Sequence, residues 1–313
     1  MDKICIVLCT YNGERFLSKM LDSLCAQTRK ADWIVAYDDG STDASVTLLE
    51  SYASRLPLRI FAGNENRGHR AAFDRALGIA KGFVDGSDLI ALADQDDEWL
   101  PEKLEIFERE IGNCALVFGD AKVVDADGNT IHPSWQKFGN IQPNVSLKAQ
   151  IAGINNVTGC VSLFRARILE DALPIPEGVT VHDRWIAMFA ERRGGVKRIS
   201  DKVIEYRLHG SNAVGGKPSP KMSETLRLQE LWVKTILQNA SRIPLREDEI
   251  RFAEKLLDLH IARLRECAAP RFLPWIIRHR DELFLPGNFK KRLRQILFSC
   301  VGLPLAKRFW KKS

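Results

Sequence analysis

Cysteine pairs of the kind that build zinc sites or disulfide frameworks are missing from this sequence. Seven cysteines occur, an odd number, and none forms a C-x-x-C pair. The pattern therefore predicts neither a structural zinc site nor a disulfide scaffold. It favours reduced thiols in a cytosolic protein.

Long hydrophobic runs are also missing. The start, MDKICIVLCTYNG, turns polar after one strand's length of apolar residues, which is not the pattern of a secretory leader. A late apolar stretch, Ile296 to Ala306, contains Gly302 and Pro304 and is shorter than the roughly 20 residues that a spanning helix needs. We therefore expect no secretion and no transmembrane segment.

Acidic residues are absent from Leu283 to the end of the chain. Residues 216–313 carry 21 Lys and Arg against 10 Asp and Glu, a balance of +11, whereas residues 1–215 carry −5. With 45% hydrophobic residues in 313, the chain is long enough to bury a full core. The asymmetry predicts a globular domain over residues 1–215 and a basic, helical region over 216–313 that faces an anionic partner.

Signatures of three other functional classes are missing. The first apolar run leads into TYNGE and not into a G-x-G-x-x-G turn, which argues against a dinucleotide-dependent oxidoreductase. The same position lacks the acidic pair that a phosphatase with an Asp nucleophile would place there. No recognition motif accompanies the basic C-terminal charge, so we expect no nucleic-acid partner.

The first two thirds of the sequence alternate short β-rich runs with helical patterns, which predicts a mainly parallel sheet covered by helices, an α/β fold. Beyond Lys217-Pro-Ser-Pro220 the apolar residues follow helical spacing instead. The predicted strands are 4–8, 33–37, 58–61, 89–92, 115–118 and 203–208, and the predicted helices are 14–26, 43–53, 69–80, one opened by Pro101, and 182–193.

Polar motifs begin where four predicted strands end. They are Thr10-Tyr11-Asn12, Asp38-Asp39-Gly40-Ser41, Asn64 to Gly68, and Asp94 to Asp97. The ends of parallel strands lie together along one edge of an α/β sheet, where ligands bind. We therefore expect the four loops to form one crevice.

The string ADQDDEW, residues 93–99, places three carboxylates within four positions. Such neighbours repel one another unless cations or N–H donors compensate. A hard divalent cation, Mg²⁺ or Mn²⁺, does so and can bridge to a diphosphate. The alternative is that the acids favour the start of the helix at Pro101, which explains one or two of them better than three.

Seven motifs together resemble the family 2 glycosyltransferases, which have a GT-A fold (a Rossmann-like sheet flanked by helices). They are IVLCTYNG, VAYDDGSTD, NENRG, ADQDDEW, TGC, HDRW and YRLHGSN, in this order over residues 1–215. The DQDDxW form and the YRxHGSN ending are most similar to rhamnosyltransferase-type members that build bacterial surface polysaccharides.

The resemblance implies a binding site for a nucleotide-diphosphate sugar. Base and ribose would be held by residues that follow the first two strands, and the diphosphate by arginines near the third. The implied set is Thr10, Tyr11, Asn12, Asp38 and Asp39, with Arg67, Arg75 and also Arg70 toward the diphosphate. The arginines have a simpler alternative as a solvated helix face.

The resemblance also implies a metal site and a base. Asp94 and Asp96 match the DxD pair, with Asp96 in direct metal contact and Asp97 touching sugar or ribose. His209 matches a third metal or phosphate contact, and a turn histidine is the alternative. Asp183 matches the general base, which takes the proton of the acceptor hydroxyl, and as an isolated residue it could instead cap the helix that follows.

The implied function is metal-dependent, inverting sugar transfer, with rhamnose from dTDP-rhamnose as the leading donor and a UDP-sugar as the alternative. The acceptor would be a lipid-linked saccharide of polysaccharide or lipopolysaccharide assembly. Basic residues such as Lys290 and Lys291 alternate with apolar ones near the C-terminus, which suits the anionic inner face of a cell membrane and a peripheral, cytoplasmic protein. The alternatives are a helical region kept soluble by its lysines, and a non-catalytic membrane-associated scaffold.

Overall fold

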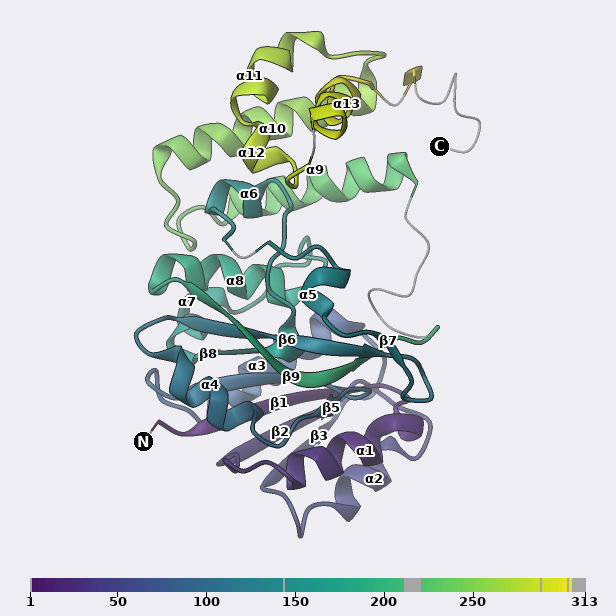
Figure 1. The fold of residues 1–313 in the computed structure, drawn as a ribbon. Helices are drawn as coiled ribbons and strands as arrows, with labels where there is room; N and C mark the ends of the chain where they lie inside the picture. Colours follow the sequence, from purple (N-terminus) through teal and green to yellow (C-terminus); the bar gives the residue numbers. More distant parts are fainter. Residues whose placement is uncertain (1, 143, 211–220, 288, 303, 306–313) are drawn as a thin grey trace. The chain divides into compact units, whose positions relative to one another are not determined.

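The computed structural model describes residues 2–142, 144–210, 221–287, 289–302 and 304–305. The chain divides into two compact units, one of residues 1–141 with 157–217 and one of residues 142–156 with 218–313 (Figure 1). The predicted division after residue 215 differs from this in one respect. Residues 142–156 leave the first unit and join the second, which no sequence signal indicated.

The first unit holds the strands of the sheet and the helices that connect them. Its strands are β1 (Ile4–Thr10), β2 (Trp33–Asp38), β3 (Leu58–Ala62), β4 (Leu89–Asp94), β5 (Glu98–Trp99), β6 (Leu116–Val124), β7 (Thr130–His132), β8 (Ser162–Arg165) and β9 (Val196–Arg207). Its helices are α1 (Glu14–Cys25), α2 (Ser45–Ser51), α3 (His69–Ala80), α4 (Lys103–Ile111), α5 (Trp135–Phe138), α7 (Leu169–Ala172) and α8 (His182–Arg193), with 3₁₀ turns η1 (Gly159–Val161) and η2 (Ala166–Ile168).

The strands form one mixed sheet in the order β3-β2-β1-β4-β8-β6-β9-β5, with β7 beside β6. The predicted α/β architecture is confirmed. The sheet is parallel over β3-β2-β1-β4 and again between β6 and β9, whereas β8, β7 and β5 pair antiparallel. Its second half therefore departs from the mainly parallel sheet expected from the sequence.

Helices cover both faces of the sheet in the first unit. On one face, α1 contributes Leu17, Met20, Leu21 and Leu24, which recur at helical spacing and pack with alternate residues of β1. Helices α2 and α4 add to the same hydrophobic cluster. Helices α3 and α8 contact each other, and α3 packs on β1 and β2 from the opposite face (Figure 1).

The second unit is helical among its described residues. It comprises α6 (Leu147–Ile151), α9 (Met222–Gln238), α10 (Glu247–Arg265), η3 (Pro270–Phe272), α11 (Leu273–Arg278), α12 (Arg280–Leu283) and α13 (Phe289–Ser299). The indole of Trp232 in α9 donates to the Ile151 carbonyl at 3.1 Å, and Lys148 pairs with Asp248 in α10 at 2.7 Å. These contacts explain why the 142–156 segment belongs with the C-terminal helices.

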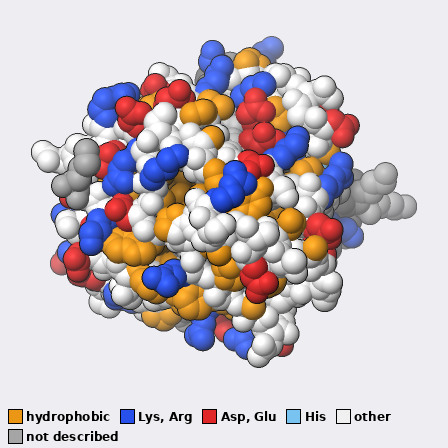
Figure 2. All heavy atoms as spheres, turned by 90° about the horizontal axis from the view of Figure 1, so that it is seen from below, with side chains coloured by type: hydrophobic (Ala, Val, Ile, Leu, Met, Phe, Trp, Pro, Cys, Tyr) orange, Lys and Arg blue, Asp and Glu red, His pale blue; other side chains and the backbone are white. Residues whose placement is uncertain are grey.

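Within the described residues, no helix combines the length and apolarity needed to cross a membrane. Figure 2 views the face at the bottom of Figure 1, where α1 and α2 lie, and shows cationic, anionic and hydrophobic side chains interspersed. Interspersed charge of both signs is the ordinary surface of a globular unit. The last basic residues of the C-terminal region expected to meet a membrane, Lys307, Arg308, Lys311 and Lys312, lie outside the described residues.

Candidate functional site

The ends of β1, β2 and β4 meet at one edge of the sheet. In the strand register Thr10 pairs with Asp38, Cys9 pairs with Asp94, and Asp38 pairs with Ala62 of β3. The polar loops that follow these strands therefore leave the sheet side by side, as the sequence predicts for parallel strands.

The first two loops are bonded to each other through buried groups. Thr10 Oγ1 donates to Asp38 Oδ2 at 2.8 Å, and Asp38 also accepts from the backbone N–H and hydroxyl of Ser41. Thr10 and Asp38 are almost fully buried, so these bonds hold the loops in shape. Direct contact of either residue with a donor nucleotide remains a prediction.

Tyr11 and Asn12 form the exposed rim of this edge. The side-chain amide of Gln95 bonds both backbone groups of Tyr11, at 2.8 and 3.0 Å, and the Tyr11 side chain is 42% exposed. Asn12 adopts a positive φ of 46°, and its side-chain oxygen accepts from Thr42 N–H at 2.9 Å. The 11–12 turn thus links β1 to the loops after β2 and β4, and leaves the Tyr11 ring facing solvent.

Asp39 joins the second loop to the third. Its Oδ2 accepts hydrogen bonds from the backbone N–H groups of Arg67 and Gly68 at 3.0 and 2.8 Å, while its buried Oδ1 has no hydrogen-bond partner among the described residues. Burial raises the pKa of Asp39 against the opposing effect of these two N–H groups. The predicted diphosphate ligands Arg67 and Arg75 are both exposed, and Arg67 pairs with Glu65 at 2.9 Å.

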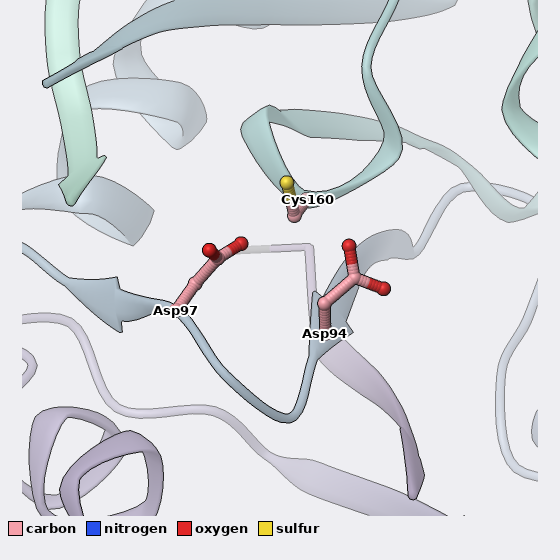
Figure 3. Close-up of side chains that lie close together, drawn as sticks. All are labelled: Asp94, Asp97 and Cys160. Carbon is pink, nitrogen blue, oxygen red and sulfur yellow. The ribbon is translucent and has the colours of Figure 1, made fainter. Parts of the chain in front are cut away.

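The carboxylates of Asp94 and Asp97 converge near Cys160 (Figure 3). One oxygen of each carboxylate and the Cys160 sulfur lie within 4.8 Å of one another. They come from the end of β4, the loop before β5, and the turn η1. The structure thus brings Asp94 together with Asp97, which the sequence had assigned to sugar or ribose.

The donor set fits a hard divalent cation through its carboxylates. Asp97 is buried, and no residue that the structure describes forms a hydrogen bond to its Oδ2, which leaves an oxygen lone pair for a cation. Burial raises the pKa of the Cys160 thiol well above its usual range, and the neighbouring Asp97 and Asp94 charges add to this. A protonated thiol is a poor ligand for Mg²⁺ or Mn²⁺, which prefer oxygen, so Asp94 and Asp97 are the ligands that the site offers.

Asp96 and His209, both predicted as metal ligands, contact each other. His209 Nε2 lies 2.7 Å from Asp96 Oδ2, and the His209 ring packs against Phe16 at 4.9 Å between centroids. Burial raises the pKa of Asp96, as does the charge of Asp94, against the effect of His209. The Asp96–His209 contact ties the acidic loop to the end of β9, and a metal role for either residue stays a prediction.

Asp183, the predicted base, lies in the first turn of α8. The helix begins at His182 and its N-cap residue is Val181, so Asp183 is not the cap. Its Oδ2 accepts Gly159 N–H at 3.1 Å and its Oδ1 accepts Arg184 N–H at 2.6 Å. Burial raises its pKa to about 6 against these two N–H groups, close to the value that suits a base at neutral pH.

His69, which no sequence motif indicated, lies between the acidic loop of Asp94 to Asp97 and the predicted base Asp183. Its Nε2 is 3.4 Å from Asp94 Oδ1, and its ring lies 4.9 Å from that of His182. Burial acts to lower the pKa of His69, but the hydrogen bond and charge of Asp94, with the charges of Asp183 and Asp96, together raise that pKa above its usual value. Burial acts to raise the pKa of Asp94, but the hydrogen bond and charge of His69 contribute to lowering it below its usual value.

Two buried cations were also missed. Arg207 is 1% exposed, donates its backbone N–H to Asp97 and its Nε to the Asp96 carbonyl, both at 3.0 Å, and pairs with Glu98. Lys103 is fully buried and donates to the Cys160 carbonyl at 2.6 Å. Arg207 belongs to the YRLHGSN motif, but the motif did not predict a role for it. Lys103 belongs to no motif, and its position in a predicted helix did not indicate that it is buried.

Comparison with known families identifies the first unit. Residues 5–173 match the model of glycosyl transferase family 2. An uncharacterized glycosyltransferase of Nostoc sp. is 30% identical over 222 residues, which are 67% of this chain and 66% of that protein. A Bacillus subtilis glycosyltransferase named for teichuronic acid biosynthesis is 25% identical over 68% of this chain and 82% of its own. The match to a further Bacillus subtilis relative spans only 49% of that protein.

Solved structures share the fold. TarS of Staphylococcus aureus, solved with UDP-GlcNAc, matches with a TM-score of 0.59 at 18% identity, over 95% of this chain and 81% of that one. A Pyrobaculum calidifontis mannosyltransferase, solved with GDP-Man and Mn²⁺, matches with a TM-score of 0.52 at 17% identity, over 99% and 88%. The family match, together with this shared fold, shows that the chain belongs to glycosyl transferase family 2.

Proposed function

We propose that the protein transfers a sugar from a nucleotide-diphosphate donor to an acceptor hydroxyl with inversion at the anomeric carbon. The observation that carries the proposal is the turn η1, which contacts both halves of the site. Its Cys160 lies with Asp94 and Asp97, and its Gly159 N–H bonds to Asp183. A cation-binding carboxylate pair and a base of raised pKa, joined by one short turn, are what such a transfer requires.

The proposed chemistry assigns each group one task. Asp183 accepts the proton of the acceptor hydroxyl as that oxygen attacks the anomeric carbon from the side opposite the diphosphate. Gly159 N–H holds the carboxylate in place. Asp94 and Asp97 would hold Mg²⁺ or Mn²⁺, which offsets the negative charge on the departing diphosphate.

The donor is proposed to be dTDP-rhamnose, with a UDP-sugar as the alternative. The rhamnosyltransferase-like motifs ADQDDEW and YRLHGSN support the first choice. Solved structures of the same fold contain UDP-GlcNAc in one case and GDP-Man in another. The fold by itself therefore does not indicate which nucleobase the donor carries. The exposed ring of Tyr11 is proposed to contact the nucleobase of the donor.

The acceptor is proposed to be a lipid-linked saccharide in bacterial surface polysaccharide or lipopolysaccharide assembly. Support comes from the relative named for teichuronic acid biosynthesis and from the surface of α13. Exposed Leu293, Leu297 and Phe298 share one face of α13 with exposed Lys290, Lys291 and Arg294. This mixture of apolar and cationic groups suits an anionic membrane surface, where each cation contributes about 1 kcal/mol.

A donor panel tests the transfer. The protein is incubated with dTDP-rhamnose, UDP-GlcNAc and GDP-mannose, with Mn²⁺ or with EDTA, in the presence of membrane lipid extract as acceptor. We expect one donor to be consumed only with Mn²⁺, and NMR of the product to show the anomeric configuration opposite to that of the donor. Retention of configuration would refute the role of Asp183, and no consumption of any donor would favour a non-catalytic scaffold.

Vesicle sedimentation tests membrane association. Reversing two cations in Lys290→Glu/Lys291→Glu should weaken binding to phosphatidylglycerol vesicles by at least about 2 kcal/mol, on the order of 30-fold. Lys81→Glu/Lys202→Glu, an equal charge change at exposed lysines of the first unit, should leave binding nearly unchanged. Equal loss in both double variants would show that net charge alone is responsible, and no binding by the unaltered protein would refute the membrane proposal.

A further inference from the structure

A lysine is buried beside the acidic loop. Lys103, the first residue of α4, has no exposed surface, and its Nζ lies 3.2 Å from the centroid of the Trp99 ring. Among the residues that the structure describes, no carboxylate lies within ion-pair distance of Nζ. Lysine buried in this way costs more than an apolar side chain of equal length, so packing alone does not account for it.

The backbone around Lys103 is fixed by the segment that follows α1. The side chain of Gln27 donates to the Leu100 carbonyl at 2.9 Å and accepts from Leu104 N–H at 3.3 Å. Thr28 N–H donates to the Pro101 carbonyl at 2.9 Å. Lys103 therefore projects from a braced helix start, and its Nζ has a defined position.

Within the described part of the chain, the Lys103 ammonium has one hydrogen-bond acceptor, the carbonyl of Cys160 at 2.6 Å. That carbonyl belongs to η1, the turn that places Cys160 against Asp94 and Asp97 and directs Gly159 N–H to Asp183. Charged donors form short, strong hydrogen bonds to carbonyls. The position of η1 is thus set from one side by Lys103.

We propose that Lys103 is a positioning residue for sugar transfer: its hydrogen bond to Cys160 holds η1 so that Gly159 N–H stays bonded to Asp183. The inference rests on the proposed role of Asp183 as the base. Burial lowers the pKa of Lys103 to about 7, opposed by Cys160, Asp97 and Asp94. A neutral amine also donates N–H, so the bond to Cys160 persists in both protonation states.

The test compares Lys103→Met, which keeps the chain length without a donor, with Lys197→Met. Lys197 of β9 likewise donates to a backbone carbonyl, that of Glu110 at 2.8 Å near the other end of α4, and also pairs with the Glu110 carboxylate at 3.0 Å. In Lys103→Met we expect faster amide hydrogen exchange over residues 157–163, with residues 4–10 unchanged. Loss of one charge-assisted hydrogen bond should lower kcat by roughly 10 to 100-fold with little change in donor KM.

The pH profile separates positioning from packing. Gly159 N–H lowers the pKa of Asp183, so weakening that bond in Lys103→Met should move the acidic limb of kcat/KM to higher pH. Lys197→Met should leave both the limb and the exchange of residues 157–163 unchanged. If Lys103→Met does not fold, Lys103→Leu, which also removes the donor, is measured in the same way and is expected to give the same shifts.

Unchanged exchange over residues 157–163 would overturn the proposal, and so would equal acceleration over residues 4–10, because Lys103 would then be merely structural. Hydrogen exchange needs no activity. If the unaltered protein transfers no sugar while exchange in Lys103→Met speeds up only at η1, the proposed function fails and the hold of Lys103 on the turn stands.

Discussion

Replacing Asp183 with asparagine should abolish transfer and stabilise the fold. Burial raises the pKa of Asp183 from 3.8 to about 6, and one pKa unit corresponds to about 1.36 kcal/mol. The ionised carboxylate therefore costs up to about 3 kcal/mol at pH 7. Asparagine carries no charge, although its amide can accept only one of the two N–H groups, from Gly159 and Arg184, that Asp183 accepts. We expect a net gain of about 1 to 2 kcal/mol.

The gain must depend on pH in one direction. Because the folded pKa of Asp183 is above the unfolded value, the cost of its charge is fully present above pH 6 and disappears as the pH falls below 3.8. The advantage of Asp183→Asn in urea unfolding should therefore shrink between pH 7 and pH 4. In the same window, kcat/KM of the unaltered protein should fall about tenfold per pH unit below 6, as expected for loss of a single base.

Urea unfolding at pH 7 and pH 4 and a transfer assay with the active donor test this reasoning. We expect transfer to fall on the order of 10² to 10⁴-fold while nucleotide binding is retained. An Asp183→Asn protein that is less stable at pH 7, or whose stability gain is equal at both pH values, would refute the burial argument. Retained transfer would refute the catalytic role.

Other predictions concern the cation site and two glycines. Asp94→Asn should weaken Mn²⁺-dependent nucleotide binding, measured by calorimetry. The loss should exceed the roughly 10 to 100-fold that is typical when a residue next to a metal ligand is replaced. Asp127→Asn, at an exposed turn, should leave this binding unchanged. Gly40→Ala should destabilise by about 1 to 3 kcal/mol in urea unfolding, because Gly40 has φ +79° and an added Cβ would lie 2.8 Å from the Glu65 backbone. Gly78→Ala, in helix α3 with open space around it, should stabilise by about 0.5 to 1 kcal/mol.

The parallel half of the sheet could be predicted from the sequence, because each strand and its helix are adjacent in the chain. The helix predicted at 182–193 and the strand predicted at 58–61 lie within a residue of α8 and β3. The antiparallel strand β8 and the helix α6 were not predicted. Their partners are distant in sequence, β4 and β6 for one and Trp232 for the other, so no local pattern indicates them.

The candidate site could also be predicted only in part. The polar residues at the ends of β1, β2 and β4 could be placed at one edge by the topology of parallel strands. The sequence could not predict which carboxylates converge, because the turn after Asp94 decides whether Asp96 or Asp97 lies close to the Asp94 carboxylate. Lys103 and His69 approach the loop from helices, and burial of a charged group within a helix leaves no mark on its apolar periodicity.

Calorimetric titration with dTDP, UDP and GDP, each with Mn²⁺ and with EDTA, would show whether this protein binds a nucleotide through a divalent cation. We expect that one nucleotide binds with Mn²⁺, that EDTA abolishes this binding, and that Asp97→Asn weakens it strongly. Failure of all three nucleotides to bind under either condition would contradict the assignment of this edge of the sheet as a donor site. Equal binding with EDTA would contradict the role given to Asp94 and Asp97.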